Sequence, residues 1–453
     1  MSVIPNSADY VRLIRSGDTR LMTRALARLD DVQIAALIDP LEAREQDSIL
    51  HLLAIERRSE VLASMRYEVA AQVIGRLAPE EAARLLGNLE SDDVADILGQ
   101  IDKEQLRPIL ARLDDADAKE LEELLAYPED SAGGIMSLDV ARIHEDVTIA
   151  EATRMLQQES EKLPGSVFYI YVVDEQERLV GVVSLRKLVI SKPDQPIHAI
   201  METELVYVSV ETHQEKVAEL ASRYDLVAIP VVDDQRRLLG AVTIDDIVDV
   251  LREEATEDIL KMAGAGGELV GTRGFRASFR ARMPWLLTSA CGGLVVAVSL
   301  KGFEESLSVV PALALFMPVV AGMGGNVGTQ SSTIMVRGLA VGFVETSRFG
   351  SLVLREVGLG ATMGVIYGAG IALLAPLVGA TSRDPLGLGL VIMFGMIGSM
   401  MIAATVGAAV PLLLHRLSID PAVATGPFVT TSVDILGLLF YFWLATMLLQ
   451  VPL

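Results

Sequence analysis

Asp434 is the only acidic residue that the sequence places deep within a long apolar segment. Pro427, Thr430 and Thr431 precede it at near-helical spacing, so the four side chains share one helix face. A carboxylate at membrane depth is costly unless it is paired or hydrated, and no Lys or Arg lies deep in an apolar segment. Water and a cation are therefore its expected partners. A protonated Asp that is hydrogen-bonded inside a helix bundle is the alternative.

A second apolar segment concentrates glycines and polar residues between Pro318 and Thr333. Glycine weakens a helix and allows close backbone approach, while polar side chains at membrane depth belong against protein or water. A packing seam of small residues is the alternative, but the amides of Asn326 and Gln330 exceed what packing requires. These residues, together with the family resemblance described below, imply an ion pathway that comprises Gly325, Asn326, Gly328, Gln330, Gly426, Pro427, Thr430 and Asp434.

A single carboxylate with polar neighbours suits a hydrated, hard cation. Mg²⁺ keeps several of its waters and often binds only one or two protein carboxylates. No His or Cys lies near Asp434 in the sequence, which argues against a dedicated site for softer metals. These residues alone leave Mg²⁺, Ca²⁺, Na⁺ and H⁺ open.

Five apolar segments can position these residues in a lipid bilayer, since a span needs about 20 residues. Eight basic residues lie in the loops on the side of the N-terminal region and two in the alternate loops, so the positive-inside rule predicts a cytoplasmic N-terminus and an outside C-terminus in the cell (inner) membrane. Buried core helices of a soluble protein are the alternative. The predicted spans cover residues 283–300, 309–336, 357–380, 386–414 and 422–449.

Charge divides the 453 residues into two contrasting parts. From Gly271 onward there are 10 basic and 7 acidic residues, which leaves 28 basic and 53 acidic residues for positions 1–270. Such an acidic part repels nucleic acid and attracts cations, although a merely solubilising surface would carry the same charge. Cys291 is the only cysteine, so a disulfide framework is excluded and a reducing cytoplasm fits the soluble part.

The acidic part begins with a helical repeat. Leu77, Leu89, Ile101 and Leu113 recur every twelve residues, each followed by residues that favour the first turn of a helix. Residues 20–127 are therefore predicted to form short, stacked helices in a solenoid, with an ordinary helical domain as the alternative. No nucleophile–base pair or His cluster occurs there, and we expect no enzymatic activity from the chain.

A second repeat follows, with a spacing of 59 residues. The segment 171–174 aligns with 230–233, and short β-branched strands flank turns in both units. This pair resembles tandem CBS domains, modules that often bind adenine nucleotides. The resemblance makes Thr243 and Asp246 of the second unit candidates for holding ribose and phosphate of a nucleotide such as ATP. The first unit departs from the pattern, because Lys187 stands where an Asp is common.

The order of the parts resembles the MgtE family of magnesium channels, on the motifs at residues 127–136, 324–330 and 420–434. The resemblance covers almost the whole chain. It implies a multidomain fold: an N-terminal α-helical solenoid (1–131), a tandem α/β CBS pair (132–252), a connecting plug-type helix and linker (253–282) and a transmembrane bundle of five α-helices (283–453). It also implies a homodimer whose pore lies on the two-fold axis, where Asp434 of each subunit selects Mg²⁺.

The resemblance further implies gating by cytosolic Mg²⁺. At low Mg²⁺ the acidic surfaces repel one another; at high Mg²⁺ ions bridge carboxylates, draw the connecting helices together and close the pore. Each candidate carboxylate has a solvated surface role as its alternative. The candidates are Asp93, Asp96, Glu215, Asp225, Asp246, Asp249, Glu254, Glu257 and Asp258.

Two other functions compete with a Mg²⁺ channel that mediates uptake. One is a cation-coupled secondary transporter of another divalent cation such as Co²⁺, with Asp434 as a carrier of protons or Na⁺. The other is a membrane-anchored nucleotide sensor, which leaves Asp434 unexplained.

Overall fold

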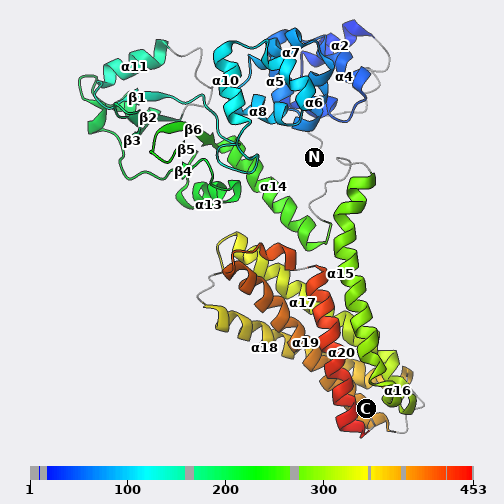
Figure 1. Cartoon of the computed structure of the whole chain (residues 1–453). Helices are drawn as coiled ribbons and strands as arrows, with labels where there is room; N and C mark the ends of the chain where they lie inside the picture. The colour runs from blue at the N-terminus through cyan, green and yellow to red at the C-terminus, as the bar shows by residue number, and fades with distance from the viewer. Residues whose placement is uncertain are drawn as a thin grey trace. The chain divides into compact units, whose positions relative to one another are not determined.

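A computed structural model describes residues 10, 18–158, 168–265, 275–344, 348–378, 384–424 and 426–450. The chain divides into two compact units, Met1–Arg252 and Glu253–Leu453, which are described separately below (Figure 1).

Short helices fill the first half of the first unit, which confirms the predicted helical repeat. Asp18 and Asp30 cap two of them, because their side chains accept hydrogen bonds from free N–H groups of the first turn. The helices are α2 (Thr19–Leu26), α3 (Asp31–Ile38), α4 (Ala43–Leu50), α5 (Ile55–Ala63), α6 (Tyr67–Arg76), α7 (Pro79–Leu86), α8 (Ser91–Gly99), α9 (Lys103–Leu110) and α10 (Asp115–Leu124).

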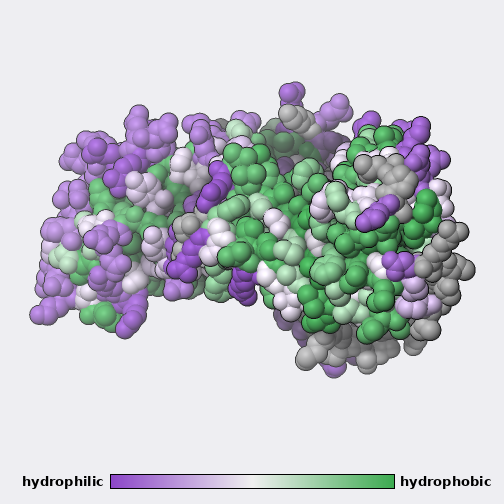
Figure 2. Space-filling view, turned by 90° about the horizontal axis from the view of Figure 1, so that it is seen from below, coloured by the Kyte–Doolittle hydropathy of each residue, from purple (hydrophilic) through white to green (hydrophobic). Residues whose placement is uncertain are grey.

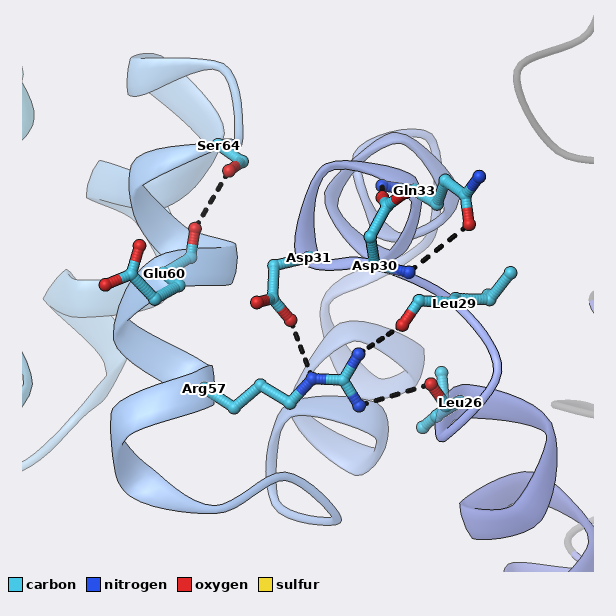
Figure 3. Close-up of polar contacts among 8 residues, drawn as sticks. All are labelled: Leu26, Leu29, Asp30, Asp31, Gln33, Arg57, Glu60 and Ser64. Carbon is cyan, nitrogen blue, oxygen red and sulfur yellow. Dashed lines mark hydrogen bonds and ion pairs between the residues drawn. The ribbon is translucent and has the colours of Figure 1, made fainter. Parts of the chain in front are cut away.

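These helices pack mainly on partners two places away in the sequence, so that α3, α5, α7 and α9 form one row and α4, α6, α8 and α10 another. Apolar side chains from both rows form the buried core of this part, and Leu85 and Ile97 have no exposed surface. Arg57 fixes the start of the first row: its Nε lies 2.7 Å from Asp31 Oδ1, and its Nη1 donates to Leu26 O at 3.2 Å (Figure 3).

Two small sheets follow, each with a central strand that is parallel to one neighbour and antiparallel to the other. The predicted spacing of 59 residues is confirmed, since β2 and β5, and likewise β3 and β6, are offset by that number. The first sheet and its helices comprise β1 (Arg142–His144), α11 (Ile149–Gln158), β2 (Tyr169–Val173), β3 (Leu179–Ser184), α12 (Leu185–Ile190) and η1 (Ile197–Ala199). The second sheet and its helix comprise β4 (Val208–Ser209), α13 (Gln214–Tyr224), β5 (Ala228–Val232) and β6 (Leu238–Thr243).

The two hairpin turns are built alike and hold the sheets together. Asp174 Oδ1 accepts from the backbone N–H of Arg178, and Asp233 Oδ1 accepts in the same way from Arg237. Across the pair, Leu179 N–H donates to Arg236 O at 2.9 Å and Leu238 N–H to Glu177 O at 3.0 Å. The sequence repeat therefore produces an internal two-fold arrangement of equivalent turns.

Five helices in the described part of the second unit are long and apolar enough to cross a membrane, as predicted. Figure 2 shows the consequence: one part of the surface is broadly hydrophobic and another is largely hydrophilic. Helix α14 (Ile244–Met262) crosses the boundary between the units. The other helices are α15 (Phe275–Lys301), α16 (Glu304–Val309), α17 (Ala312–Ala340), α18 (Phe349–Val378), α19 (Pro385–Arg416), η3 (Pro421–Ala424) and α20 (Pro427–Leu449).

The third membrane span begins at a different residue from the one predicted. Its apolar helix runs over Phe349–Pro376 and so begins eight residues earlier than expected. The early turns carry Arg355 and Glu356, whose charges hid the helix start from a search for uninterrupted apolar residues. The expectation that Asp434 is the only acid within an apolar segment is therefore wrong, because Glu356 also lies inside one and is buried.

Helix α19 is the centre of this bundle and packs against α17, α18 and α20, while α15 packs against α20. Glycines allow α18 and α19 to approach at backbone distance. An added Cβ at Gly364 would lie 2.5 Å from Ile397 Cα, and one at Gly368 would lie 2.8 Å from Met393 O. Only a residue without a side chain fits such positions.

Candidate ion pathway and cytosolic cation site

Helix α17 has one packed face and one open face in its glycine-rich middle. An added Cβ at Gly324 would lie 2.7 Å from Ser399 Oγ, and one at Gly328 would lie 3.1 Å from Val429 Cγ1 and from Val433 Cγ2. At Gly322 and Gly325 no atom lies within 4 Å of an added Cβ. The packing-seam alternative thus explains Gly324 and Gly328, but it does not explain the open face.

The amide side chains of the predicted pathway lie on the open side of this helix. Asn326 and Gln330 are exposed in the single chain, and Gly322 precedes them on the same stripe. Their spacing of four residues keeps them together on an unbroken helix, since α17 continues through this segment. Amides that face lipid are costly, so this stripe requires protein or water against it.

The first two turns of α20 hold the remaining predicted residues of the pathway. Gly426 is the N-cap and Pro427 the first helical residue, where a missing N–H costs nothing. Thr430 Oγ1 donates to Gly426 O or Pro427 O, at 3.3 and 3.2 Å. Asp434 follows one turn later and is partly exposed. Thr431, which shares this helix face, lies against α15, because an added Cβ at Gly292 would overlap its Cγ2.

Within the described residues, the carboxylate of Asp434 has neither an ion-pair nor a hydrogen-bond partner in the protein. This matches the premise that no base is available to neutralise it. A carboxylate in that position is stabilised by water or by a cation that reaches it.

The end of α14 lies against the start of α20. An added Cβ at Gly426 would lie 2.9 Å from Met262 O, and one at Gly264, whose φ is 69°, would lie 3.3 Å from Pro427 Cδ. Lys261 Nζ contacts Asp420 Oδ2 at 2.8 Å and Glu257 Oε1 at 2.9 Å. Burial would lower the pKa of Lys261, but the bonds to Asp420 and Glu257 outweigh it and raise that pKa. The end of α14 is thus held at the start of α20 by the ion pair between Lys261 and Asp420 and by the close approach of the two chain segments.

A cluster of carboxylates lies in the first unit, where α8 of the helical part meets the start of α14. Burial, with the charges of Asp92 and Glu90, raises the pKa of Asp93 to about 8. Burial and the charges of Asp92 and Asp245 raise the pKa of Glu90 to about 7. Burial and the charge of Asp92 likewise raise the pKa of Asp246. Deprotonated, these groups would repel one another, so the cluster attracts a proton or a metal cation.

Two hydrogen bonds fix this meeting point. Ser91 N–H donates to Asp139 Oδ2 at 3.0 Å, and Leu138 N–H donates to Ser91 Oγ at 2.9 Å. They join the first turn of α8 to the segment that enters the first small sheet. The acidic first turn is thereby held beside Asp245 and Asp246 of α14.

The cluster suits a hydrated divalent cation. Asp92 Oδ1 is buried and has no hydrogen-bond partner within the described part of the chain, so one ligand oxygen is available. Among the residues that the structure describes, no three Asp, Glu, His or Cys side chains are gathered closely enough to enclose a metal. Mg²⁺ does not need such a cage, because it keeps several waters and can be held by one or two carboxylates.

Sequence reasoning found Asp93, Asp96 and Asp246 of this cluster and missed Glu90, Asp92 and Asp245. Asp96 also belongs to the cluster. Burial raises the pKa of Tyr67, and the negative charges of Asp96 and Asp93 raise it further, so both carboxylates lie near the same tyrosine. The missed residues are direct neighbours of the found ones, so the run of acids at positions 90–96 was the available signal.

The other candidate carboxylates lie elsewhere on these helices. Glu215 is in the first turn of α13, and Asp225 ends that helix in a left-handed conformation with a φ of 52°. Asp249 contacts Arg252 at 3.1 Å, and Glu257 contacts Lys261. Glu254 and Asp258 lie on α14. Their regulatory role stays a prediction.

The candidate nucleotide residues meet at the junction of β6 and α14. Thr243 Oγ1 donates to Asp246 Oδ2 at 3.1 Å and also contacts Asp245. At the corresponding junction of β3 and α12, Lys187 Nζ lies 3.4 Å from Glu202 Oε1. Nucleotide binding by Thr243 and Asp246 stays a prediction, and Asp246 would be shared with the acidic cluster.

The raised pKa values predict how the stability of the acidic cluster depends on pH. The folded cluster keeps protons that the unfolded chain releases near the ordinary carboxyl pKa, so its contribution to stability is lost progressively as pH rises from that value through 7 to 8. Without divalent cations, the unfolding temperature of the full-length protein should fall between about pH 5 and about pH 8 and stay level above that range. Thermal unfolding in detergent measures it, and Mg²⁺ added at the higher pH should restore the loss.

Asp93→Asn is the matched variant, because the amide keeps the shape of the side chain and does not titrate. The pH dependence should be weaker in this variant. An unfolding temperature that stays constant, or rises, over the same pH range would contradict the assignment of a proton- and cation-seeking cluster.

Comparison with known proteins identifies relatives for each part of the chain. A divalent cation transporter model, MgtE, matches residues 317–444; the MgtE intracellular N domain model matches 29–130; and the CBS domain model matches 132–192 and 197–253. The magnesium transporter MgtE of Thermus thermophilus is 40% identical over 73% of this chain and 73% of its own length. That of Bacillus subtilis is 37% identical over 73% of this chain and 72% of its own length.

Similarity in structure follows the same lines. A crystal structure described as the cytosolic domain of the Mg²⁺ channel MgtE in complex with ATP is 35% identical and covers 54% of this chain and 99% of its own, with a TM-score of 0.51. Relatives that are named as enzymes match less of the chain: the inosine-5'-monophosphate dehydrogenase of Aquifex aeolicus, for example, is 25% identical over 48% of it.

Proposed function

The chain belongs to the MgtE family of magnesium transporters, and from that premise we propose that it is a Mg²⁺-selective channel that cytosolic Mg²⁺ closes. The observation that carries the proposal is the carboxylate of Asp434, which lies within an apolar helix and has no ion-pair or hydrogen-bond partner among the described residues. A fixed charge without a protein partner attracts a cation, and a carboxylate suits hydrated Mg²⁺. We assign selection to Asp434 and lining of the pathway to Asn326, Gln330 and the backbone around Gly325, Gly426 and Thr430.

A homodimer accounts for the open face of α17. In the single chain the stripe of Gly322, Asn326 and Gln330 is uncovered, and lipid would leave both amides without hydrogen-bond partners. A second copy across a two-fold axis covers the stripe and leaves room for a hydrated ion between the two subunits. Asp434 then acts as a pair, one from each subunit.

Gating rests on one feature at each end of α14: the acidic cluster at its start and the ion pairs of Lys261 at its end. Mg²⁺ bound at the cluster of Glu90, Asp92, Asp93 and Asp246 stabilises the packing of the helical part against the start of α14. The far end of α14 is tethered to the entrance of α20 through Lys261. Because Mg²⁺ binds the assembled state more tightly, rising cytosolic Mg²⁺ shifts the population toward the state in which α14 blocks the entrance.

The distribution of bases sets the orientation in this proposal. Arg276, Arg280 and Arg282 lie at the start of α15, and Arg337 lies near the end of α17. The first unit is then cytoplasmic and the end of α20 lies outside. With an interior-negative membrane potential, Mg²⁺ flows inward.

Two glycines that are open in the single chain test where the pathway lies. Replacing Cys291 by Ser removes the only cysteine, and Gly325→Cys or Gly370→Cys then introduces one where an added Cβ meets no atom within 4 Å. A positively charged, water-soluble thiol reagent should modify Cys at 325 and block Mg²⁺ flux, and Mg²⁺ should slow the modification. The reagent needs water, which the pathway supplies and lipid does not.

Gly370→Cys is the control, because Gly370 is equally open but lies on α18, which we assign to the lipid side. It should react only with an apolar maleimide. Equal reactivity of both cysteines toward the charged reagent, or none at 325, would contradict this placement of the pathway.

A further inference from the structure

Glu356 is a buried acid that the proposed conduction path does not use. It lies in the second turn of α18 and is 6% exposed. Its Oε2 accepts a hydrogen bond of 2.8 Å from Ser331 Oγ, and Ser331 itself is 4% exposed on α17. A buried carboxylate inside a membrane helix is costly, so a protein that keeps one there has a use for it.

The middle of the helix that Glu356 holds has few side chains that can interlock with its neighbours. Four of the seven residues from Gly322 to Gly328 are glycines, which weaken the helix and offer no side chains. Where Gly324 and Gly328 contact α19 and α20, α17 presents only its backbone, because glycine has no side chain. Such contacts fix the distance between helices better than they fix rotation about the helix axis.

The hydrogen bond from Ser331 to Glu356 restricts the rotation of α17 about its own axis. Ser331 follows Gln330 directly, about 100° further around the helix. Its other side packs on α19, since an added Cβ at Gly407 would lie 3.1 Å from Ser331 Cβ. A rotation of α17 large enough to turn Asn326 and Gln330 away from the open face would separate Ser331 from Glu356.

We propose that Glu356 is a positioning residue for ion selection: through Ser331 it sets the rotation of α17 and thereby aims Asn326 and Gln330 into the pathway. The inference rests on the proposed channel function. It assigns the role to hydrogen bonding by the Glu356 side chain rather than to its charge, because the side chain is turned away from the open face.

The test compares Glu356→Ala, Ser331→Ala and Glu356→Gln in liposomes, with the ratio of Mg²⁺ to Ca²⁺ flux as the readout. The first two remove the bond and should lower the ratio by about fivefold. Glu356→Gln keeps an acceptor oxygen for Ser331 and should retain the wild-type ratio within about twofold. Ser332→Ala is the matched control: its buried hydroxyl has no hydrogen-bond partner, so the ratio should not change.

Two results would overturn the inference. An unchanged ratio in both Glu356→Ala and Ser331→Ala would show that the bond serves packing alone, and a loss in Glu356→Gln as large as in Glu356→Ala would show that the charge matters. A wild type that conducts no Mg²⁺ would instead refute the proposed function. In that case the positioning role is tested by the rate at which the charged thiol reagent modifies Cys at 325. The rate should change when Ser331→Ala is added, and an unchanged rate would refute the positioning role.

Discussion

Asp434→Asn is expected to lower Mg²⁺ flux by about 100-fold, which corresponds to about 2.7 kcal/mol of lost stabilisation along the path. The carboxylate of Asp434 has no protein partner among the described residues, so its charge is free to act on the ion. Asparagine keeps the size and the hydrogen-bonding oxygen but removes the charge. Ions that need less stabilisation than Mg²⁺ should be affected less, so the variant should also lose selectivity.

The measurement is Mg²⁺ uptake into liposomes that contain the purified protein, beside the control Glu304→Gln. Glu304 is an exposed acid of the short helix α16 and has no assigned part in conduction. Its replacement should leave uptake within about twofold of the wild type. Equal uptake by wild type and Asp434→Asn would make Asp434 a structural acid, and the path would have to run elsewhere.

The double variant Glu90→Ala/Asp93→Ala is expected to raise the Mg²⁺ concentration that closes the channel by about tenfold or more, since each lost ligand weakens binding to the closed state. Both side chains belong to the buried acidic cluster, and neither is a candidate for nucleotide binding. Alanine removes the ligand oxygens, whereas an amide would leave one in place. Single-channel recordings at stepped cytosolic Mg²⁺ measure the shift.

Removing these carboxylates also relieves their repulsion, which by itself would favour closure. The two effects have opposite signs, so the recordings distinguish them. Closure at lower Mg²⁺, or without Mg²⁺, would show that the cluster acts by repulsion and holds no ion. Glu80→Gln is the control, because Glu80 is exposed and paired with Arg112 at 2.9 Å, and the closing concentration should stay unchanged.

Periodicity in the sequence predicted most of the architecture, for a physical reason. Twelve-residue spacing of leucines specifies short helices, and a 59-residue offset specifies two equivalent sheets, because each pattern reflects which face is buried. Such features depend on neighbours in the sequence.

Features that depend on distant residues were only partly predicted. Asp93 and Asp246 were both candidates, but their meeting depends on Ser91, which bonds Asp139 and Leu138, and no periodicity encodes that contact. Glu356 was missed because a charge beside Arg355 is typical of a loop, and only its bond to Ser331 explains its burial. Likewise, glycine spacing on α17 could not separate the packed Gly324 from the open Gly325.

The measurement that tests the central claim most directly is Mg²⁺ flux into liposomes under a membrane potential or a pH gradient, each imposed alone. A channel predicts flux that follows the potential and persists without a pH gradient, because the ion moves down its own electrochemical gradient. Flux that requires a proton or Na⁺ gradient would contradict the channel and make Asp434 the carrier site of a coupled transporter.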